Sequence, residues 1–138
     1  MLSNRSMPKS TVVPELAYPD LGEAITWLES VFGFTLRLRI ADHRAQLNVG
    51  DGSIVITQHP SAGAITPQAH SVMVRVENVD DHYARTLEHG ALILRSPETY
   101  PYGERQYSVV DPTGRTWTFS QSIADIDPAD WGGTPGSL

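Results

Sequence analysis

Hydrophobic residues follow two spacings along this chain, and the two spacings predict different elements. In the segment 21–32 they recur every three or four positions, which is the spacing of one face of a helix. Asp20 is placed to cap the start of this helix and Gly33 to end it. A second helix is expected over residues 79–88, followed by Gly90.

Shorter runs, either alternating or continuously hydrophobic, predict strands before and after each helix. Most of these runs are bounded by glycine, proline or aspartate, which favour turns. The expected strands cover residues 11–17, 34–40, 45–49, 53–58, 71–76, 92–95, 106–110 and 115–120. The order is one strand, one helix and three strands, and it occurs twice.

The residues that bound the helices and hairpins also have similar spacing in the two halves. Asp20 and Glu77 each lie 13 residues before the glycine that ends their helix, and the hairpin at 50–52 corresponds to the one at 111–114. Either module alone would expose one face of its sheet, so pairing the two is expected to enclose a pocket. We therefore predict an α+β fold in which two paired βαβββ modules form a curved mixed sheet around a pocket, with the helices outside.

The polar ends of the chain lack these patterns. Trp131 is an exception, because an isolated large aromatic residue in a polar tail is expected to dock, for example on a neighbouring subunit. The predicted organisation is a flexible lead-in at 1–10, a single domain at 11–122 and an extended tail at 123–138. The domain comprises a module at 11–59, a linker at 60–69 and a module at 70–122.

Charge and composition narrow the class of function. The chain has 138 residues, a formal net charge of -6 and no cysteine. An acidic protein is poorly suited to binding nucleic acid through its phosphates, and without cysteine there is no thiolate nucleophile or cysteine metal site. No apolar span and no signal-peptide core are recognised, so a cytoplasmic protein without membrane or nucleic-acid partners is expected.

The last predicted strand separates two environments. Thr116, Thr118 and Ser120 alternate with Trp117 and Phe119, so one face is small and polar and the other is large and apolar. The aromatic pair is expected to face the core. The threonines should then line whatever lies on the opposite face.

Two phrases carry a resemblance to a known family. The segment 24–34 (AITWLESVFGF) and the segment 111–117 (DPTGRTW), in this order of elements, are similar to the vicinal oxygen chelate superfamily, which includes glyoxalases, bleomycin-resistance proteins and extradiol dioxygenases. The segments 74–85 and 102–107 resemble a mostly uncharacterised glyoxalase-like branch. The resemblance implies the paired-module fold and a homodimer.

Metal-dependent members of this superfamily place histidine or glutamate ligands on the first and last strand of each module. Carried over to this sequence, those positions are Val13, Ile56 or Gln58, Ser71 and Thr118. None is a histidine or a carboxylate, whereas borderline metals need such donors. We therefore predict no metal site and no cofactor.

The histidines do not restore a metal site. His70 lies next to Ser71, but strand parity places it with Val72 and Val74, the apolar set expected under the helix. His59 follows the fourth strand alone. His43, His82 and His89 are expected to be solvated surface residues.

The same parity selects the side chains expected to line the pocket. Glu15 could act as a general base if burial raised its pKa, and Arg75 could hold a substrate carboxylate or enolate; alternatively the two pair with each other or reach solvent. The aromatic segment 100–107 could cover a planar ligand, with Arg105 stacking on it, or could seal a sheet edge or a dimer contact. The predicted ligand-binding residues are Val13, Ile56, Gln58, Ser71, Met73, Arg75, Tyr102, Arg105, Tyr107 and Thr118.

Two functions follow from this pocket. The first is a metal-independent protein resembling bleomycin-resistance proteins, which binds a small, largely apolar or aromatic molecule in an inter-module or dimer pocket. The alternative is an enzyme of the same superfamily, either a metal-free isomerase or lyase that uses Glu15 as base, or a divalent-metal glyoxalase or dioxygenase with non-standard ligands. The sequence leaves open whether any reaction is catalysed.

Overall fold

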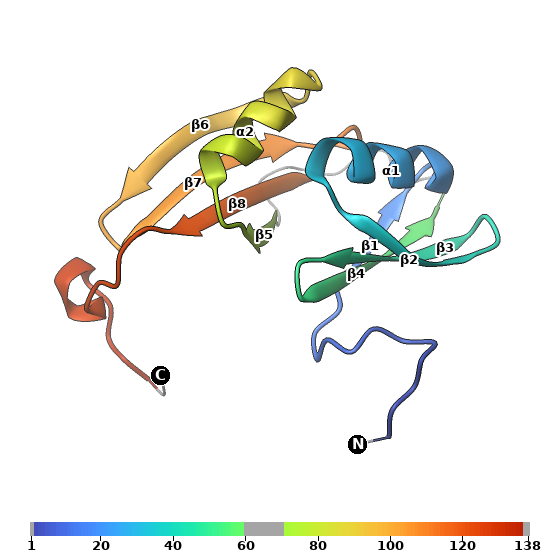
Figure 1. Ribbon diagram of the computed structural model, residues 1–138, viewed down its shortest axis with the longest axis horizontal. Coiled ribbons are helices and arrows are strands. Elements are labelled where there is room, and N and C mark those ends of the chain that lie inside the picture. The colour runs from blue at the N-terminus through green and yellow to red at the C-terminus, as the bar shows by residue number, and fades with distance from the viewer. Residues whose placement is uncertain (1, 60–70, 137–138) are drawn as a thin grey trace. The chain divides into compact units, whose positions relative to one another are not determined.

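A computed structural model describes residues 2–59 and 71–136, and it has the predicted α+β class with two βαβββ modules. The chain divides into two compact units, Met1–Ile65 and Thr66–Leu138, and each unit contains one module (Figure 1). Each module has its own four-stranded mixed sheet. The predicted linker at 60–69 and His70 lie outside the described residues.

The first unit begins with β1 (Glu15–Tyr18), followed by α1 (Leu21–Trp27) and a π-helical turn at Leu28–Phe32. The strands β2 (Thr35–Ile40), β3 (Arg44–Val49) and β4 (Gly52–Gln58) complete a sheet in the order β1-β4-β3-β2. The caps are those expected from the sequence: the Glu23 N–H donates to Asp20 Oδ1 at 2.9 Å, and Gly33 ends the helical segment with a φ of 78°.

The second unit repeats this arrangement with β5 (Ser71–Arg75), α2 (Val79–Glu88), β6 (Leu92–Tyr100), β7 (Glu104–Val110) and β8 (Thr116–Ser122). Its sheet has the matching order β5-β8-β7-β6, with β5 and β8 parallel. The cap of α2 is Asn78, whose Oδ1 accepts the Asp81 N–H at 3.0 Å. The counterpart of Asp20 is therefore Asn78, and the expectation that placed Glu77 there is wrong by one residue.

A glutamine near the end of the last strand of each module joins that strand to the start of the helix. The Leu21 N–H donates to Gln58 Oε1 at 3.0 Å, and the Val79 N–H donates to Gln121 Oε1 at 2.9 Å. The first N–H groups of a helix have no partner within the helix, so an amide oxygen here satisfies one of them. This shared contact fixes the alignment of the two modules residue by residue.

Each sheet buries the face that its helix covers. In the first unit Leu16, Leu47 and Ile56 are buried with the helix residues Leu21 and Leu28. In the second unit the buried set is Val79, Tyr107, Val109, Trp117 and Phe119. The opposite face of each sheet, here called the helix-free face, carries most of the strands' polar side chains.

Strand β6 is longer than the hydrophobic pattern predicts, because it continues through Pro97 to Tyr100. It lies at the edge of its sheet, and its register shifts between Arg95 and Glu98. A proline without an N–H is tolerated at such a shift in an edge strand. Because β6 extends to Tyr100 and β7 begins at Glu104, only residues 101–103 remain for the turn between them. Gly103 in this turn has a φ of 84°.

Both ends of the chain make contacts that the sequence pattern does not predict. The lead-in forms hydrogen bonds with the first sheet through the carbonyls of Arg5, Ser6 and Met7. The tail forms a short 3-10 helix, Pro128–Trp131, capped by Asp127. In the described part of the chain, no helix is long and apolar enough to cross a membrane.

Candidate functional site

The helix-free face of the second sheet holds the densest set of predicted site residues. The register pairs Ser71 with Thr116, Met73 with Thr118 and Arg75 with Ser120, so all six share one face. Trp117 and Phe119 lie on the other face and are fully buried. The predicted alternation along β8 is thus confirmed.

A network of short polar side chains crosses this face. Thr118 Oγ1 and Ser108 Oγ lie 2.9 Å apart, and Gln106 Nε2 donates to Ser120 Oγ at 3.0 Å. The Ser120 hydroxyl in turn donates to Glu104 Oε1 at 2.7 Å. Sequence reasoning missed the β7 members of this network, although their alternation with Tyr107 and Val109 was a usable signal.

Glu104 supplies a negative charge at the end of this network. Burial raises the pKa of its carboxyl, but hydrogen bonds from Ser122 and Ser120 and the charge of Arg75 outweigh that effect. The pKa of Glu104 therefore lies below its ordinary value, and the carboxylate is ionised at neutral pH. Such a group orients neighbouring donors and is poorly suited to act as a general base.

An aromatic cluster, comprising Tyr100, Tyr102 and Trp131, adjoins the polar network. The rings of Tyr100 and Tyr102 stack with centroids 5.4 Å apart, and the Trp131 ring lies 5.1 Å from that of Tyr102. The Tyr102 hydroxyl donates to Gln106 Oε1 at 3.2 Å, which links the cluster to the network. Trp131 is 47% exposed, so part of its ring area is open to a ligand.

The turn at Gly103 holds the tail that carries Trp131. The N–H groups of Ile123 and Ala124 donate to the Gly103 carbonyl at 2.8 and 3.3 Å. A Cβ at position 103 would lie 2.5 Å from the Ala124 carbonyl oxygen, so only glycine fits there. The tail is therefore docked on its own unit, and the prediction of an extended tail is wrong.

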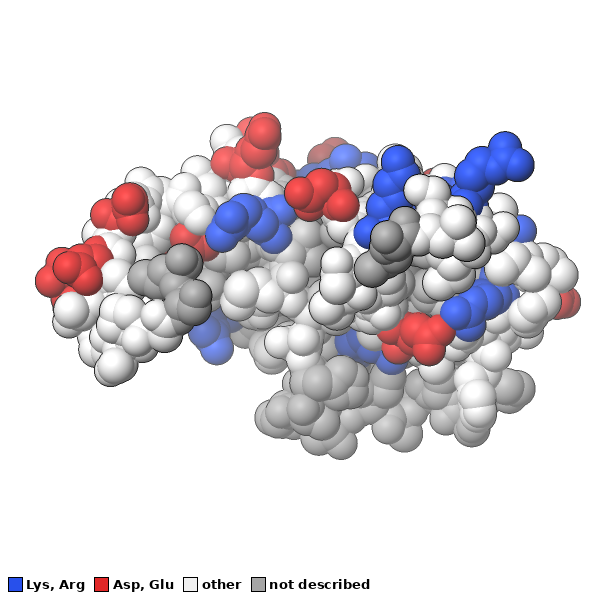
Figure 2. All heavy atoms as spheres, turned by 90° about the horizontal axis from the view of Figure 1, so that it is seen from below, with Lys and Arg blue, Asp and Glu red and all other residues white. Residues whose placement is uncertain are grey.

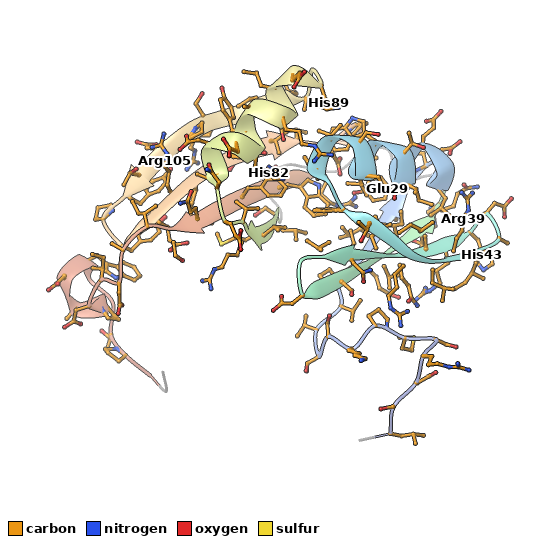
Figure 3. The ribbon with its side chains drawn as sticks, viewed as in Figure 1. Glu29, Arg39, His43, His82, His89 and Arg105 are labelled. Carbon is orange, nitrogen blue, oxygen red and sulfur yellow. The ribbon has the colours of Figure 1, made fainter. Side chains whose placement is uncertain are left out.

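Two residues predicted to bind the ligand belong to the helix-covered side of the second sheet. Tyr107 is fully buried, and its hydroxyl lies 2.8 Å from Thr86 Oγ1 and 2.6 Å from His82 Nδ1. Arg105 forms an ion pair with Asp80 of α2 at 3.1 Å (Figure 3). Both side chains connect the sheet to α2, so neither lines the helix-free face.

A similar correction applies to β4 in the first unit. Ile56 is fully buried, and Gln58 caps α1, so both lie on the helix-covered side. The register pairs Val55 with Glu15 and Thr57 with Ala17. These four residues lie on the helix-free face. The aligned glutamines make Val55, rather than Ile56 or Gln58, the counterpart of Thr118.

Glu15 is not in the partly buried environment expected from the sequence. Its side chain is 60% exposed and forms an ion pair with Arg44 at 2.6 Å. The partner is therefore Arg44, while the predicted partner Arg75 lies near Glu104. The Glu15 carboxylate thus faces solvent and a cation rather than a pocket, which weakens the case for a general base.

The donor set at the superfamily's metal-ligand positions does not fit a divalent ion. With the β4 position corrected, it comprises Val13, Val55, Ser71 and Thr118. Valine has no donor atom, and the Thr118 hydroxyl already pairs with Ser108. Across residues 2–59 and 71–136, no three histidine, cysteine or acidic side chains come together in a way that could hold a metal ion.

The described histidines occupy separate elements. His82 is half-buried against the sheet, where its ring stacks on Phe119 at 4.0 Å, so the prediction of a solvated surface residue is wrong for it (Figure 3). His89 follows α2 and His43 lies in the turn between β2 and β3, and both are exposed. His59 follows β4, with its N–H donating to the Tyr18 carbonyl at 2.8 Å.

Charged side chains do not gather into one region on the face shown in Figure 2. Blue and red residues are scattered there among uncharged side chains, and neither colour forms a continuous patch. A surface of this kind offers a ligand a few isolated charges. The candidate site itself consists mainly of aromatic and neutral polar side chains, and its charged members are Arg75 and Glu104.

Comparisons with known proteins identify the family. The sequence model of the Glyoxalase/Bleomycin resistance protein/Dioxygenase superfamily matches residues 11–119, and the chain belongs to this superfamily. The comparison with curated proteins found no significant match.

Among solved structures, TioX from Micromonospora sp. ML1 is 35% identical, with a TM-score of 0.69 over 86% of this chain and 100% of that one. A bleomycin-binding protein in complex with bleomycin is 23% identical, with a TM-score of 0.65 over 82% of this chain and 98% of the other. The fosfomycin resistance protein FosX of Listeria monocytogenes is 14% identical, with a TM-score of 0.68 over 83% and 94% of the two chains. The last two support the fold alone.

Proposed function

We propose that this protein binds a small, largely apolar or aromatic molecule without the help of a metal ion. The observation that supports this best is the aromatic cluster of Tyr100, Tyr102 and Trp131, adjoining a polar network on the helix-free face of the second sheet. An apolar surface with a few placed polar groups is the usual composition of a small-molecule site.

The two parts of this site suit two parts of a ligand. The exposed portion of Trp131 and the neighbouring Tyr102 ring offer stacking surface to a planar group. Arg75 can pair with an anionic or carbonyl oxygen of the same molecule, and Met73, which is 63% exposed, adds an adaptable apolar surface. Of the ligand-binding residues predicted from the sequence, this site keeps Ser71, Met73, Arg75, Tyr102 and Thr118.

The superfamily is compatible with such a role. One of the solved relatives is described as a bleomycin-binding protein in complex with bleomycin, and this precedent concerns that protein. For the present chain the identity of the ligand, the homodimer and the cytoplasmic location remain predictions. The enzymatic alternative has less support, because Glu15 is exposed and ion-paired and the metal-ligand positions lack suitable donors.

Removing the Trp131 ring is expected to weaken binding of planar aromatic compounds by about fivefold, because a lost stacking contact costs about 1 kcal/mol. A panel of naphthalene, anthracene and acridine derivatives is first screened by thermal shift, since a ligand that binds the native state raises Tm. Affinities of the hits are then measured for the wild type, Trp131→Ala and Tyr102→Ala.

Leu92→Ala is the matched control, because Leu92 is 69% exposed at the opposite end of β6 from the aromatic cluster. Tryptophan fluorescence gives a second readout: Trp117 is fully buried, Trp27 of the first unit is half-buried and Trp131 is 47% exposed, so quenching that is lost in Trp131→Ala is assigned to Trp131. Unchanged affinity in both aromatic variants, or no stabilising compound in the panel, would count against the proposal.

We expect the purified protein to contain no stoichiometric divalent metal. Neither Val13, Val55 nor Ser71 offers a charged or imidazole donor, and one threonine hydroxyl does not replace such donors. Elemental analysis after purification without added metal tests this, together with the change in Tm on adding Zn²⁺, Ni²⁺ or Mn²⁺. A metal content near one ion per chain would contradict metal-independent binding.

A further inference from the structure

The N-terminal segment lies against the helix-free face of the first sheet, on the side opposite α1 (Figure 1). Two side chains hold it. Arg37 Nη2 donates to the carbonyl oxygens of Arg5 at 2.9 Å and Met7 at 3.1 Å, and Gln46 Nε2 donates to that of Ser6 at 2.9 Å. Three successive backbone carbonyls are therefore bound by one guanidinium and one amide.

The two donors are fixed in place by the sheet. Gln46 is 2% exposed, and its Oε1 accepts a hydrogen bond from Arg37 Nη1. That bond sets the orientation of the Gln46 amide, so its NH2 group points to the bound segment. Together the pair offers donors without a competing acceptor, which suits a row of carbonyl oxygens.

The bound segment contributes little through its own side chains. Arg5, Ser6 and Met7 are exposed, and Met7 retains 46% of its accessible surface. The hydrogen bonds from Arg37 and Gln46 go to main-chain oxygens, which every peptide-like molecule possesses. Contacts of this kind do not depend on the sequence of the occupant.

We propose that Arg37 and Gln46 form a binding site for successive amide carbonyls, and that residues 5–7 are its built-in, displaceable occupant. The ligand class is an oligoamide, meaning a molecule with several consecutive amide groups. This assignment of a ligand class rests on the proposed small-molecule function, whereas the docking of the segment does not. The segment covers the site until an oligoamide takes its place.

The docking is tested in the full-length chain by the rate at which trypsin cleaves after Arg5. A protease must take the segment in extended form, so docking slows cleavage. Gln46→Leu and Arg37→Lys should each accelerate the release of residues 1–5 by about tenfold, because hydrogen bonds to a charged or buried partner are lost. Mass spectrometry follows the released fragment.

Arg39→Lys is the matched control, because Arg39 lies on the same strand and donates to the Ala41 carbonyl rather than to the segment. It should leave the rate of cleavage after Arg5 unchanged. To exclude a folding artefact, the Tm of Gln46→Leu and of Arg37→Lys must each lie within about 5 °C of the wild-type Tm, a difference that corresponds to about 1 kcal/mol of stability. Equal cleavage in the wild type and both variants would overturn the docking.

The ligand class is tested with acetyl-tetraalanine amide at millimolar concentration, a probe with consecutive amides, no aromatic ring and no trypsin site. It should accelerate cleavage after Arg5 in the wild type at least twofold and have no effect in Gln46→Leu. N-methylacetamide at the same amide concentration is the control for unconnected amides, and a reference tryptic substrate reports any effect on trypsin itself.

If the probe leaves wild-type cleavage unchanged, the oligoamide assignment is overturned. This outcome is separate from a failure of the proposed function, which is detected by the aromatic panel and by Trp131 fluorescence. A protein that binds aromatic compounds but ignores the oligoamide keeps the proposed function and loses this inference.

Discussion

Replacing Asp111 with alanine is expected to lower the free energy of unfolding by about 3–5 kcal/mol, the cost of breaking a buried charged contact. The Asp111 side chain is fully buried, and four donor groups surround it. Its Oδ1 accepts from the Thr113 N–H, the Thr113 hydroxyl and the Arg115 N–H, and its Oδ2 accepts from Trp117 Nε1 at 3.0 Å. Alanine would leave these donors without their acceptor in the core.

The loss is measured by urea unfolding, followed by circular dichroism and by tryptophan fluorescence. Asp111→Asn gives a second variant if the alanine form does not fold: it keeps an acceptor for the turn but places an NH2 group toward Trp117, so a smaller loss is expected. The matched control is Asp51→Ala at the corresponding hairpin of the first unit, where the side chain is exposed and the change should stay within about 0.5 kcal/mol. Equal losses at the two positions would contradict the role assigned to Asp111.

The second large effect is a loss of stability in alkaline solution that depends on Tyr107. Burial raises the pKa of Tyr107 to about 12, against about 10 for a tyrosine in the unfolded chain. Between these values the unfolded chain loses the proton and the folded protein keeps it. The contribution is fully present below pH 10 and is lost as pH rises toward 12, by about 3 kcal/mol in total.

Denaturant unfolding at several values between pH 9 and 12 measures this slope. Tyr107→Phe should remove this group's part of the alkaline loss, while costing about 1 kcal/mol at neutral pH through the lost hydroxyl contacts with Thr86 and His82. Tyr100→Phe keeps Tyr107 and should retain the wild-type slope. The chain's single lysine, Lys9, is exposed, so lysine titration adds little to the comparison. A Tyr107→Phe slope equal to that of the wild type would refute the assignment.

Several parts of the fold were predictable because their causes are local. The side chain of Asp20 can cap the helix that follows it, and Gly33 can take the positive φ that ends the helical segment. The alternation of Thr116 and Thr118 with Trp117 and Phe119 reflects the two faces of one strand and needs no knowledge of its neighbours. These features sufficed for the two βαβββ modules and for the family.

The face of a strand was harder to predict where both faces are apolar. Ile54, Val55 and Ile56 are all buried, so a period of two does not distinguish their faces. The cap contact between Gln58 and the Leu21 N–H, a residue 37 positions away, decides it. The sequence alone therefore placed Ile56 and Gln58 on the wrong side.

Tyr107 and Arg105 show a second limit of the same kind. A tyrosine or an arginine can line a pocket or join a strand to a helix, and the choice depends on the groups opposite it. Here Thr86, His82 and Asp80 of α2 provide those groups. The pairing is visible only once the helix is packed on its sheet.

By itself, the sequence determined the class of fold, the duplication, the capped helices and the polar face of β8, because all of these follow from contacts or periodicities within a few residues. The hairpin at 111–114 was also recognised, though only as a turn. The tertiary structure decided the faces of β4 and β7, the docking of the lead-in on Arg37 and Gln46, and the contact of Trp131 with Tyr102. Each of these depends on partners distant in the sequence, whose positions are set by packing and strand register rather than by local preference.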